Sequence, residues 1–266
     1  MGFFDKMLSK VGIGAAKVDT ILNSSLTKPG GLISGVVHVK GGNVDQDISH
    51  IDVSLMVGVK VESDDESDDY TYDVKKDIDD DYTYYEPNLI YKHRVTGSFK
   101  IHKGENRQFP FEFNVPLEVP ITVLGPYKLS NIKLYVKTDL DIENALDKAD
   151  KDYLEIEPLP TMVNFLNAIV NLGFSFHKAD VEKGRLPGSN YHFFQEIEFY
   201  GSRSRFPKIK ELEVTFLANP NEVNVILEMD KKGLFGSSDK YREMSIPYDG
   251  SNFNYENELS NLLSQV

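Results

Sequence analysis

A short aromatic run at residues 109–116 constrains the fold of this chain more than any other feature of the sequence. Phe109, Phe111 and Phe113 recur at every second position, and this period places their rings on one face of a β-strand. Burying each ring stabilises the fold by about 2–3 kcal/mol, so a second layer has to cover this face. Pro110 lacks a backbone donor, which favours a strand at the edge of its sheet. The sequence therefore predicts a β-sandwich with this strand at an edge.

Alternating apolar residues predict further strands on both sides of this run. Residues 51–61 alternate most strictly, and residues 90–101 form a second long pattern whose aromatic and aliphatic side chains share a face. We expect these two strands to form a hairpin, with the acidic residues between them as an overlong loop. Shorter strands are expected at residues 17–22, 32–39 and 132–136. About seven strands without a helix among them are typical of a sandwich domain.

The character of the chain changes near residue 158, where two prolines follow an acidic stretch. We therefore place a domain boundary there. The N-terminal domain is expected to be a β-sandwich over residues 1–157, with an acidic insertion at residues 62–87. The C-terminal domain is expected over residues 158–266 and should also be mostly β.

Two helices are expected in the C-terminal domain, near residues 161–172 and 256–265. The first is indicated by an apolar stripe at helical spacing, formed by Met162, Phe165, Leu166, Ile169 and Val170. Thr161 is expected to cap this helix, and Gly173 is expected to end it.

Most of the net charge of −13 comes from one segment. Residues 62–86 hold twelve acidic residues against two lysines, which leaves the rest of the chain nearly balanced. Such a segment is either a solvated loop whose charges repel one another or a docking segment for a basic partner, with tyrosines as anchors. On the second interpretation, the candidate partner-contact residues are Asp64, Asp65, Asp68, Asp69, Tyr82, Tyr84 and Tyr85.

Composition excludes several classes of protein. The acidic balance argues against nucleic-acid binding through a basic surface. The chain has no cysteine, which excludes disulfides, thiolate catalysis and cysteine zinc sites and suits a reducing cytoplasm. No apolar run approaches the ~20 residues that a membrane helix needs, and the N-terminus lacks the apolar core of a secretory signal. We therefore expect a cytoplasmic protein.

No residues predict a catalytic centre, a cofactor site or a metal centre. The six histidines have no metal-ligand spacing to one another. Glu196 with Glu198, and Glu211 with Glu213, are carboxylate pairs of the kind that glycosidases use. Acids at every second position are also what the exposed face of a strand allows, and we favour this reading. The expected protein is therefore not an enzyme.

Two alternatives to a regulatory protein stay open. One is a calcium-dependent ligand- or carbohydrate-binding β-sandwich, because the acids of residues 139–150 resemble the alternating ligands of a calcium loop. Asn144, however, stands where such a loop requires glycine. The other is a peripheral membrane scaffold, in which Phe3, Phe4 and Leu8 on a short N-terminal helix contact the lipid. The sequence also leaves a homodimer open.

Three aspartates are candidates for polar contacts between the two domains. Asp139, Asp141 and Asp152 lie shortly before the expected boundary. We expect them to form charged contacts across it, with Lys137 or Lys151 as partners.

Several segments resemble the bacterial sporulation-control family named after the stage-0 protein M. These segments are residues 12–20, 29–42, 109–113, 136–142, 194–199 and 211–214. They occur in one order along nearly the whole chain. The resemblance implies two arrestin-like β-sandwiches in tandem with a few short helices, in a cytoplasmic adaptor that regulates by binding other proteins and not by catalysis. The acidic insertion departs from the family pattern in length and charge, so no partner surface is carried over to it.

Overall fold

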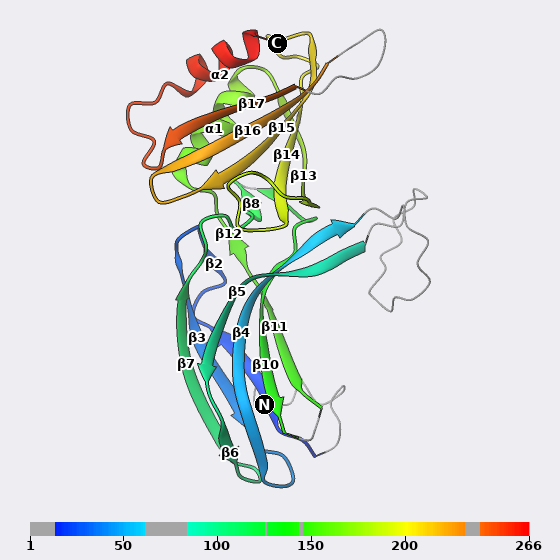
Figure 1. Cartoon of the computed structure of the whole chain (residues 1–266), viewed down its shortest axis with the longest axis vertical. Helices are drawn as coiled ribbons and strands as arrows, with labels where there is room; N and C mark the ends of the chain where they lie inside the picture. Colours follow the sequence, from blue (N-terminus) through cyan, green and yellow to red (C-terminus); the bar gives the residue numbers. More distant parts are fainter. Residues whose placement is uncertain (1–13, 62–83, 126, 144–145, 232–239, 266) are drawn as a thin grey trace.

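The computed structural model describes residues 14–61, 84–125, 127–143, 146–231 and 240–265 (Figure 1). Two β-rich halves follow one another along the long axis, with the first half at the bottom of the view and the second half at the top. Strands dominate both halves, and the described residues contain two helices. The predicted mainly-β fold class is therefore confirmed.

The first half is a sandwich of two antiparallel sheets. Its main strands are β1 (Lys17–Leu22), β3 (Leu32–Lys40), β4 (Gln46–Val61), β5 (Tyr84–Thr96), β6 (Phe99–Ile101), β7 (Asn106–Asn114), β10 (Leu134–Ile142) and β11 (Lys148–Tyr153). One sheet has the order β1-β3-β7. In the other, β11, β10 and β4 are neighbours, and β5 and β6 also pair with β4. Val37 from the first sheet and Leu55 from the second are both fully buried in the shared core.

The aromatic run forms β7. Phe111 and Phe113 are buried, and Phe109 packs against Phe99 with ring centroids 5.0 Å apart. From the opposite sheet, the ring of Tyr91 lies 5.1 Å from that of Phe113. Among the described residues β7 pairs with β3 alone. The predicted buried face and the predicted edge position are both confirmed.

β4 and β5 form the predicted hairpin, which ends with Val61 opposite Tyr84. The expectation of one continuous strand over residues 90–101 is wrong, because β5 ends at Thr96 and β6 begins only at Phe99. The pairing of β4 with β5 shifts register between Ile51 and Asp52. This shift lies within β5, where Thr96 stands opposite Ile51 and Arg94 opposite Asp52. The break itself keeps the register, since Phe99 stands opposite Ile48.

The second half is an antiparallel sheet covered by a helix. Its elements are α1 (Pro160–Asn171), β13 (Ser175–Lys183), β14 (Phe193–Tyr200), β15 (Ile209–Ala218), β16 (Glu222–Lys231), β17 (Lys240–Pro247) and α2 (Tyr255–Ser264). The strands follow one another in chain order across the sheet. Phe165 of α1 meets Phe216 of β15 edge-on, with ring centroids 5.9 Å apart. α2 lies beside α1, where the Asn171 amide donates to Glu256 Oε1 at 2.6 Å.

Both helices start one residue earlier than predicted. Gly173 follows α1 with a φ of 94°, which fits its predicted role at the helix end. The predicted cap at Thr161 is wrong. The helix begins after Leu159 without a side-chain cap, and Pro160 in the first turn has no N–H to satisfy. The Thr161 hydroxyl instead donates to the carbonyl of Tyr248 at 2.8 Å.

One continuous sheet runs through both halves. β13 pairs in parallel with the end of β4 through a single residue pair, Glu182 opposite Lys60. The side chain of Gln195 also hydrogen-bonds both backbone groups of Ile121, at 2.8 and 2.9 Å. The described residues hold four further short strands, namely β2 (Leu26–Thr27), β8 (Val123–Leu124), β9 (Tyr127–Lys128) and β12 (Glu155–Ile156). β12 pairs with β2, so the boundary proposed at residues 157 and 158 falls between β12 and α1.

Replacing Gly41 with alanine is expected to destabilise the first half by about 1–2 kcal/mol. The new Cβ would stand 2.0 Å from the backbone carbonyl oxygen of His102, so the backbone would have to shift. Gly97 is the matched control, because a Cβ there meets no atom within 4 Å. Urea unfolding of the two variants checks the prediction, and equal losses of stability would contradict it.

Candidate functional site

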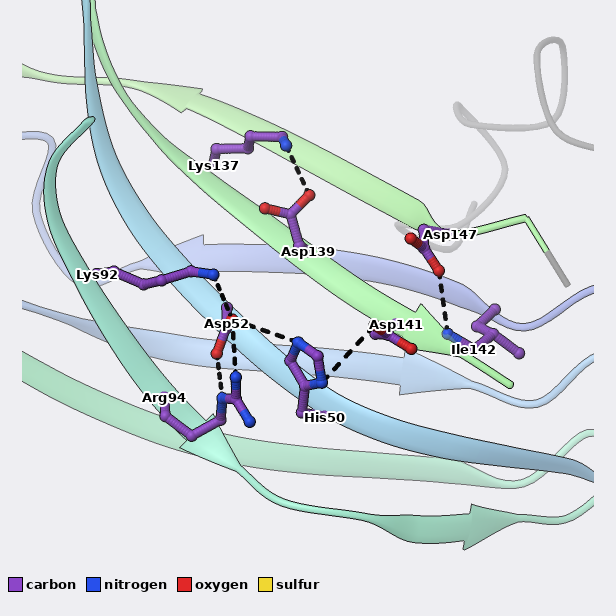
Figure 2. Close-up of polar contacts among 9 residues, drawn as sticks. All are labelled: His50, Asp52, Lys92, Arg94, Lys137, Asp139, Asp141, Ile142 and Asp147. Atoms are coloured by element: carbon purple, nitrogen blue, oxygen red, sulfur yellow. Dashed lines mark hydrogen bonds and ion pairs between the residues drawn. The ribbon is translucent and has the colours of Figure 1, made fainter. Parts of the chain in front are cut away.

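The outer face of the sheet made by β10, β4 and β5 carries a group of charged side chains (Figure 2). Successive residues of a strand point to opposite faces, so residues paired across strands share a face. Asp139 of β10 stands opposite Asp52 of β4, which stands opposite Arg94 of β5. His50 and Lys92 flank this row in Figure 2. We call these side chains, together with Lys137 and Asp141, the charged face.

Asp52 is the buried centre of the charged face, with 1% of its side chain exposed. Arg94 donates from Nε to Oδ1 and from a terminal nitrogen to Oδ2 at 3.2 Å. Lys92 Nζ lies 2.8 Å from Oδ2, and His50 Nε2 lies 3.3 Å from it. Burial alone would raise the pKa of Asp52, but the hydrogen bonds from Arg94 and Lys92 outweigh it and keep the pKa below its usual value. Asp52 therefore stays ionised and fixes the cations around it.

Each lysine and arginine of the charged face pairs with an aspartate and is also about half exposed to water. Lys92 and Arg94 are 53% and 54% exposed, and Lys137 is 42% exposed. Beyond them, Lys151 Nζ lies 3.7 Å above the ring of Tyr135. This face therefore presents positive charges at fixed positions on a protein that is acidic overall.

Two of the three aspartates predicted to join the domains belong to the charged face. Asp139 pairs with Lys137 at 2.7 Å, which is one of the partners expected for it. Asp141 Oδ2 lies 3.7 Å from His50 Nδ1. Both contacts lie within the first half, so neither joins the two halves.

Asp152, the third of these aspartates, lies elsewhere, at the seam between β11 and β1. Burial raises its pKa to about 7, and the negative charges of Asp150 and Asp19 add to the rise. Its Oδ2 is buried without a hydrogen-bond partner among the described residues. None of these neighbours belongs to the second half, so the interdomain role expected for Asp139, Asp141 and Asp152 gains no support from their contacts.

The acids that resemble a calcium loop are engaged separately from one another. Asp147 Oδ1 accepts a hydrogen bond from the backbone N–H of Ile142 at 3.2 Å. Asp150 Oδ2 accepts one from the backbone N–H of Thr20 at 2.7 Å. Asp147 therefore holds the end of β10, and Asp150 joins β11 to β1.

Five of the residues expected to contact a partner lie outside the described residues, namely Asp64, Asp65, Asp68, Asp69 and Tyr82. The same holds for the membrane-contact candidates Phe3, Phe4 and Leu8. Tyr84 and Tyr85 begin β5, and Lys133 Nζ lies 4.9 Å above the ring of Tyr85. Within the described part of the chain, neither helix has the length and apolar character of a membrane span.

A second cluster gathers acidic side chains of the second half, including the pairs Glu196 with Glu198 and Glu211 with Glu213. The exposed strand face expected for these pairs is wrong for Glu198, which is buried. Asp180 stands opposite Glu196, while Glu198 stands opposite Glu213, and Glu213 opposite Glu228. The carboxylate oxygens of Glu196, Glu213 and Glu228 lie within 4.8 Å of one another. Two ionised carboxylates at this distance repel by about 3 kcal/mol at the effective dielectric of a protein surface. We call Glu196, Glu198, Glu211, Glu213 and Glu228 the glutamate ladder. The repulsion among their carboxylates favours a proton on at least one of them.

The glutamate ladder lies beside the junction of the two halves. A cavity of about 360 Å³ opens there, lined by acids of β13, β14 and β15 and by Lys60 of β4 and Lys178 of β13. Lys178 Nζ lies 3.3 Å from Glu198 Oε2 and 3.5 Å from Asp180 Oδ2. Lys60 Nζ lies 3.5 Å from Glu182 Oε1, so Lys60 of the first half and Glu182 of the second half form an ion pair across the junction.

Two members of the ladder, Glu196 and Glu211, have pKa values well above that of an ordinary glutamate. The pKa of Glu196 is raised to about 8 by burial and by the charges of Glu213, Glu182 and Glu228. A hydrogen bond to Glu198, helped by burial, raises the pKa of Glu211 to about 7. Acids at alternate positions were visible in the sequence, but only the strand register brings them together across strands.

Residues 4–233 of the chain match the family model described as SpoOM protein. The chain belongs to the Spo0M family. The sporulation-control protein Spo0M of Bacillus subtilis is 36% identical over 274 residues, which span 100% of this chain and 98% of that relative. The crystal structure of Spo0M from Bacillus subtilis matches with a TM-score of 0.77 and 34% identity, covering 95% of this chain and 99% of that one. The match confirms the resemblance seen in the sequence and shows that the Spo0M family shares this β-rich fold through both halves.

Proposed function

We propose that this protein is a cytoplasmic, non-enzymatic regulator of sporulation that acts as an adaptor by binding other proteins. The regulatory part of the proposal rests on the full-length similarity to the sporulation-control protein of Bacillus subtilis. The binding part rests on the charged face of the first half. Its cations point away from the core on a broad sheet surface, where a second protein can meet them.

The single observation that carries the binding mechanism is the buried, ionised Asp52. It holds Arg94 and Lys92 by hydrogen bonds and ion pairs while about half of each cation stays exposed. The positive charges of Arg94 and Lys92 are therefore held in fixed positions before a partner with acidic side chains binds. Such preorganisation lowers the entropy lost on binding, and the fixed charges select among partners.

A complementation experiment tests the proposal. In a Bacillus subtilis strain without Spo0M, expression of this chain is expected to restore the frequency of heat-resistant spores. The double variant Lys92→Ala and Lys137→Ala should restore it several-fold less well and lose crosslinks to partner proteins. Both side chains are about half exposed, so the fold should tolerate their removal.

The matched control is the double variant Lys100→Ala and Lys210→Ala. These lysines are at least as exposed as Lys92 and Lys137, and they pair with Asp47 and Asp230, away from the charged face. The control should behave like the unmodified chain. Equal restoration by both double variants would refute the role of the charged face, and a chain that restores nothing in any form would refute the regulatory role.

A further inference from the structure

Glu182 makes two of the contacts between the two halves, beside the hydrogen bonds of Gln195 with Ile121 and of Ser189 with Glu118. Its backbone provides the one residue pair between β13 and β4, opposite Lys60. Its side chain also makes the ion pair with Lys60, at 3.5 Å. Any force that displaces Glu182 therefore acts on both contacts at once.

Glu196 lies where it can exert such a force. It stands diagonally across the strand pair from Glu182, since its direct partner on β13 is Asp180. Among the described residues no lysine, arginine or histidine forms an ion pair with Glu196. Its carboxylate lies instead within 4.8 Å of those of Glu213 and Glu228. An ionised Glu196 would therefore repel acids on each side.

The charged groups around Glu196 are six acids and two lysines. They are Lys178, Asp180 and Glu182 of β13, Glu198 of its own strand, Glu211 and Glu213 of β15, Glu228 of β16 and Lys60 of β4. Lys178 is already engaged by Asp180 and Glu198, and Tyr241 donates to Glu228 Oε1 at 2.7 Å. The favourable state of Glu196 in this arrangement is the protonated one.

We propose that the junction is a proton-sensitive joint, which is closed while Glu196 carries a proton and loosens when that proton is lost. Ionised Glu196 repels Glu182 and competes with it for Lys60. The displacement weakens the contact between β4 and β13, and the two halves gain freedom to change their relative orientation. Since the raised pKa of Glu196 lies near 8, the joint would respond to alkalinisation just above neutrality.

Distance measurements between spin labels test this proposal directly. The chain has no cysteine, so Gln108→Cys in the first half and Lys208→Cys in the second place labels at two exposed positions. At pH 6.5 we expect one distance population, and at pH 9 a second population. The variant Glu196→Gln should keep a single population at both pH values, because it has no proton to lose. The control Glu112→Gln, on an exposed part of β7, should respond like the unmodified chain.

A second variant keeps the test informative if Glu196→Gln does not fold. Lys60→Gln removes the ion pair across the junction, so it should show the second population already at pH 6.5. One unchanged population in the unmodified chain from pH 6.5 to pH 9 would overturn the proposal. So would an equal pH response of Glu196→Gln, or a Lys60→Gln variant that stays closed at pH 6.5.

Discussion

Replacing Phe165 with alanine is expected to lower the free energy of unfolding by about 3–5 kcal/mol. Phe165 is fully buried in α1, and its ring meets Phe216 of β15 edge-on with centroids 5.9 Å apart. The variant loses the apolar burial of one ring and leaves a cavity between the helix and the sheet. It also loses the aromatic contact that holds α1 against the strands. Urea unfolding followed by circular dichroism measures the loss.

Val170→Ala is the matched control for this prediction, because Val170 lies on the same helix and is 52% exposed. Its removal should change the stability by no more than about 0.5 kcal/mol. If both variants lost the same stability, the loss would reflect the helix itself, and the packing of α1 on the sheet would not contribute as described.

The fold of the first half was predictable because its signals are local. A period of two assigns each side chain to a face without knowledge of the rest of the chain, so Phe111 and Phe113 were correctly placed in the core. The hairpin of β4 with β5 followed from two long patterns around one acidic segment. The break between Thr96 and Phe99 was missed, because both sides of it pair with β4 in one register, with Thr96 opposite Ile51 and Phe99 opposite Ile48.

The cap of α1 shows where local rules fail. A threonine before an apolar stripe is a frequent N-cap, but Pro160 fixes its own φ and starts the helix one residue earlier. The Thr161 hydroxyl then bonds to Tyr248, which is 87 residues away in the sequence. No rule confined to neighbouring residues anticipates such a partner.

For the candidate sites, the sequence identified several of the residues but not how the fold groups them in space. Asp139, Asp141 and Asp152 are close in sequence, and they were therefore treated as one group. The hairpin of β10 and β11 separates them, so that Asp152 faces Asp19 while the other two join the charged face. Asp52, which organises that face, was not recognised from the sequence. A single aspartate that alternates with apolar residues in a strand is predicted to face the solvent. The burial of Asp52 depends on long side chains from β5 that only the strand register reveals.

Replacing Glu196 with glutamine is expected to stabilise the protein at pH 8.5 by about 2–3 kcal/mol and to change its stability little at pH 5. The pKa of Glu196 rises from an ordinary value of 4.5 to about 8 in the folded protein. Between these values the folded protein keeps a proton that the unfolded chain has lost, so stability falls as the pH rises through this window. A fully buried group would give about 5 kcal/mol, and screening by water at this partly exposed side chain reduces the effect.

The prediction concerns the difference between the two proteins at each pH, because Asp152 and Glu211 also have raised pKa values and contribute to the slope of the unmodified chain. Urea unfolding at pH 5, 7 and 8.5 should show a gap that widens with pH and levels off above about 8. Glu112→Gln, at an exposed position on β7, should follow the unmodified chain at each pH. A gap that is constant across the three values would mean that the amide simply packs better than the acid. Glu196 would then carry no proton in the folded protein that the unfolded chain lacks.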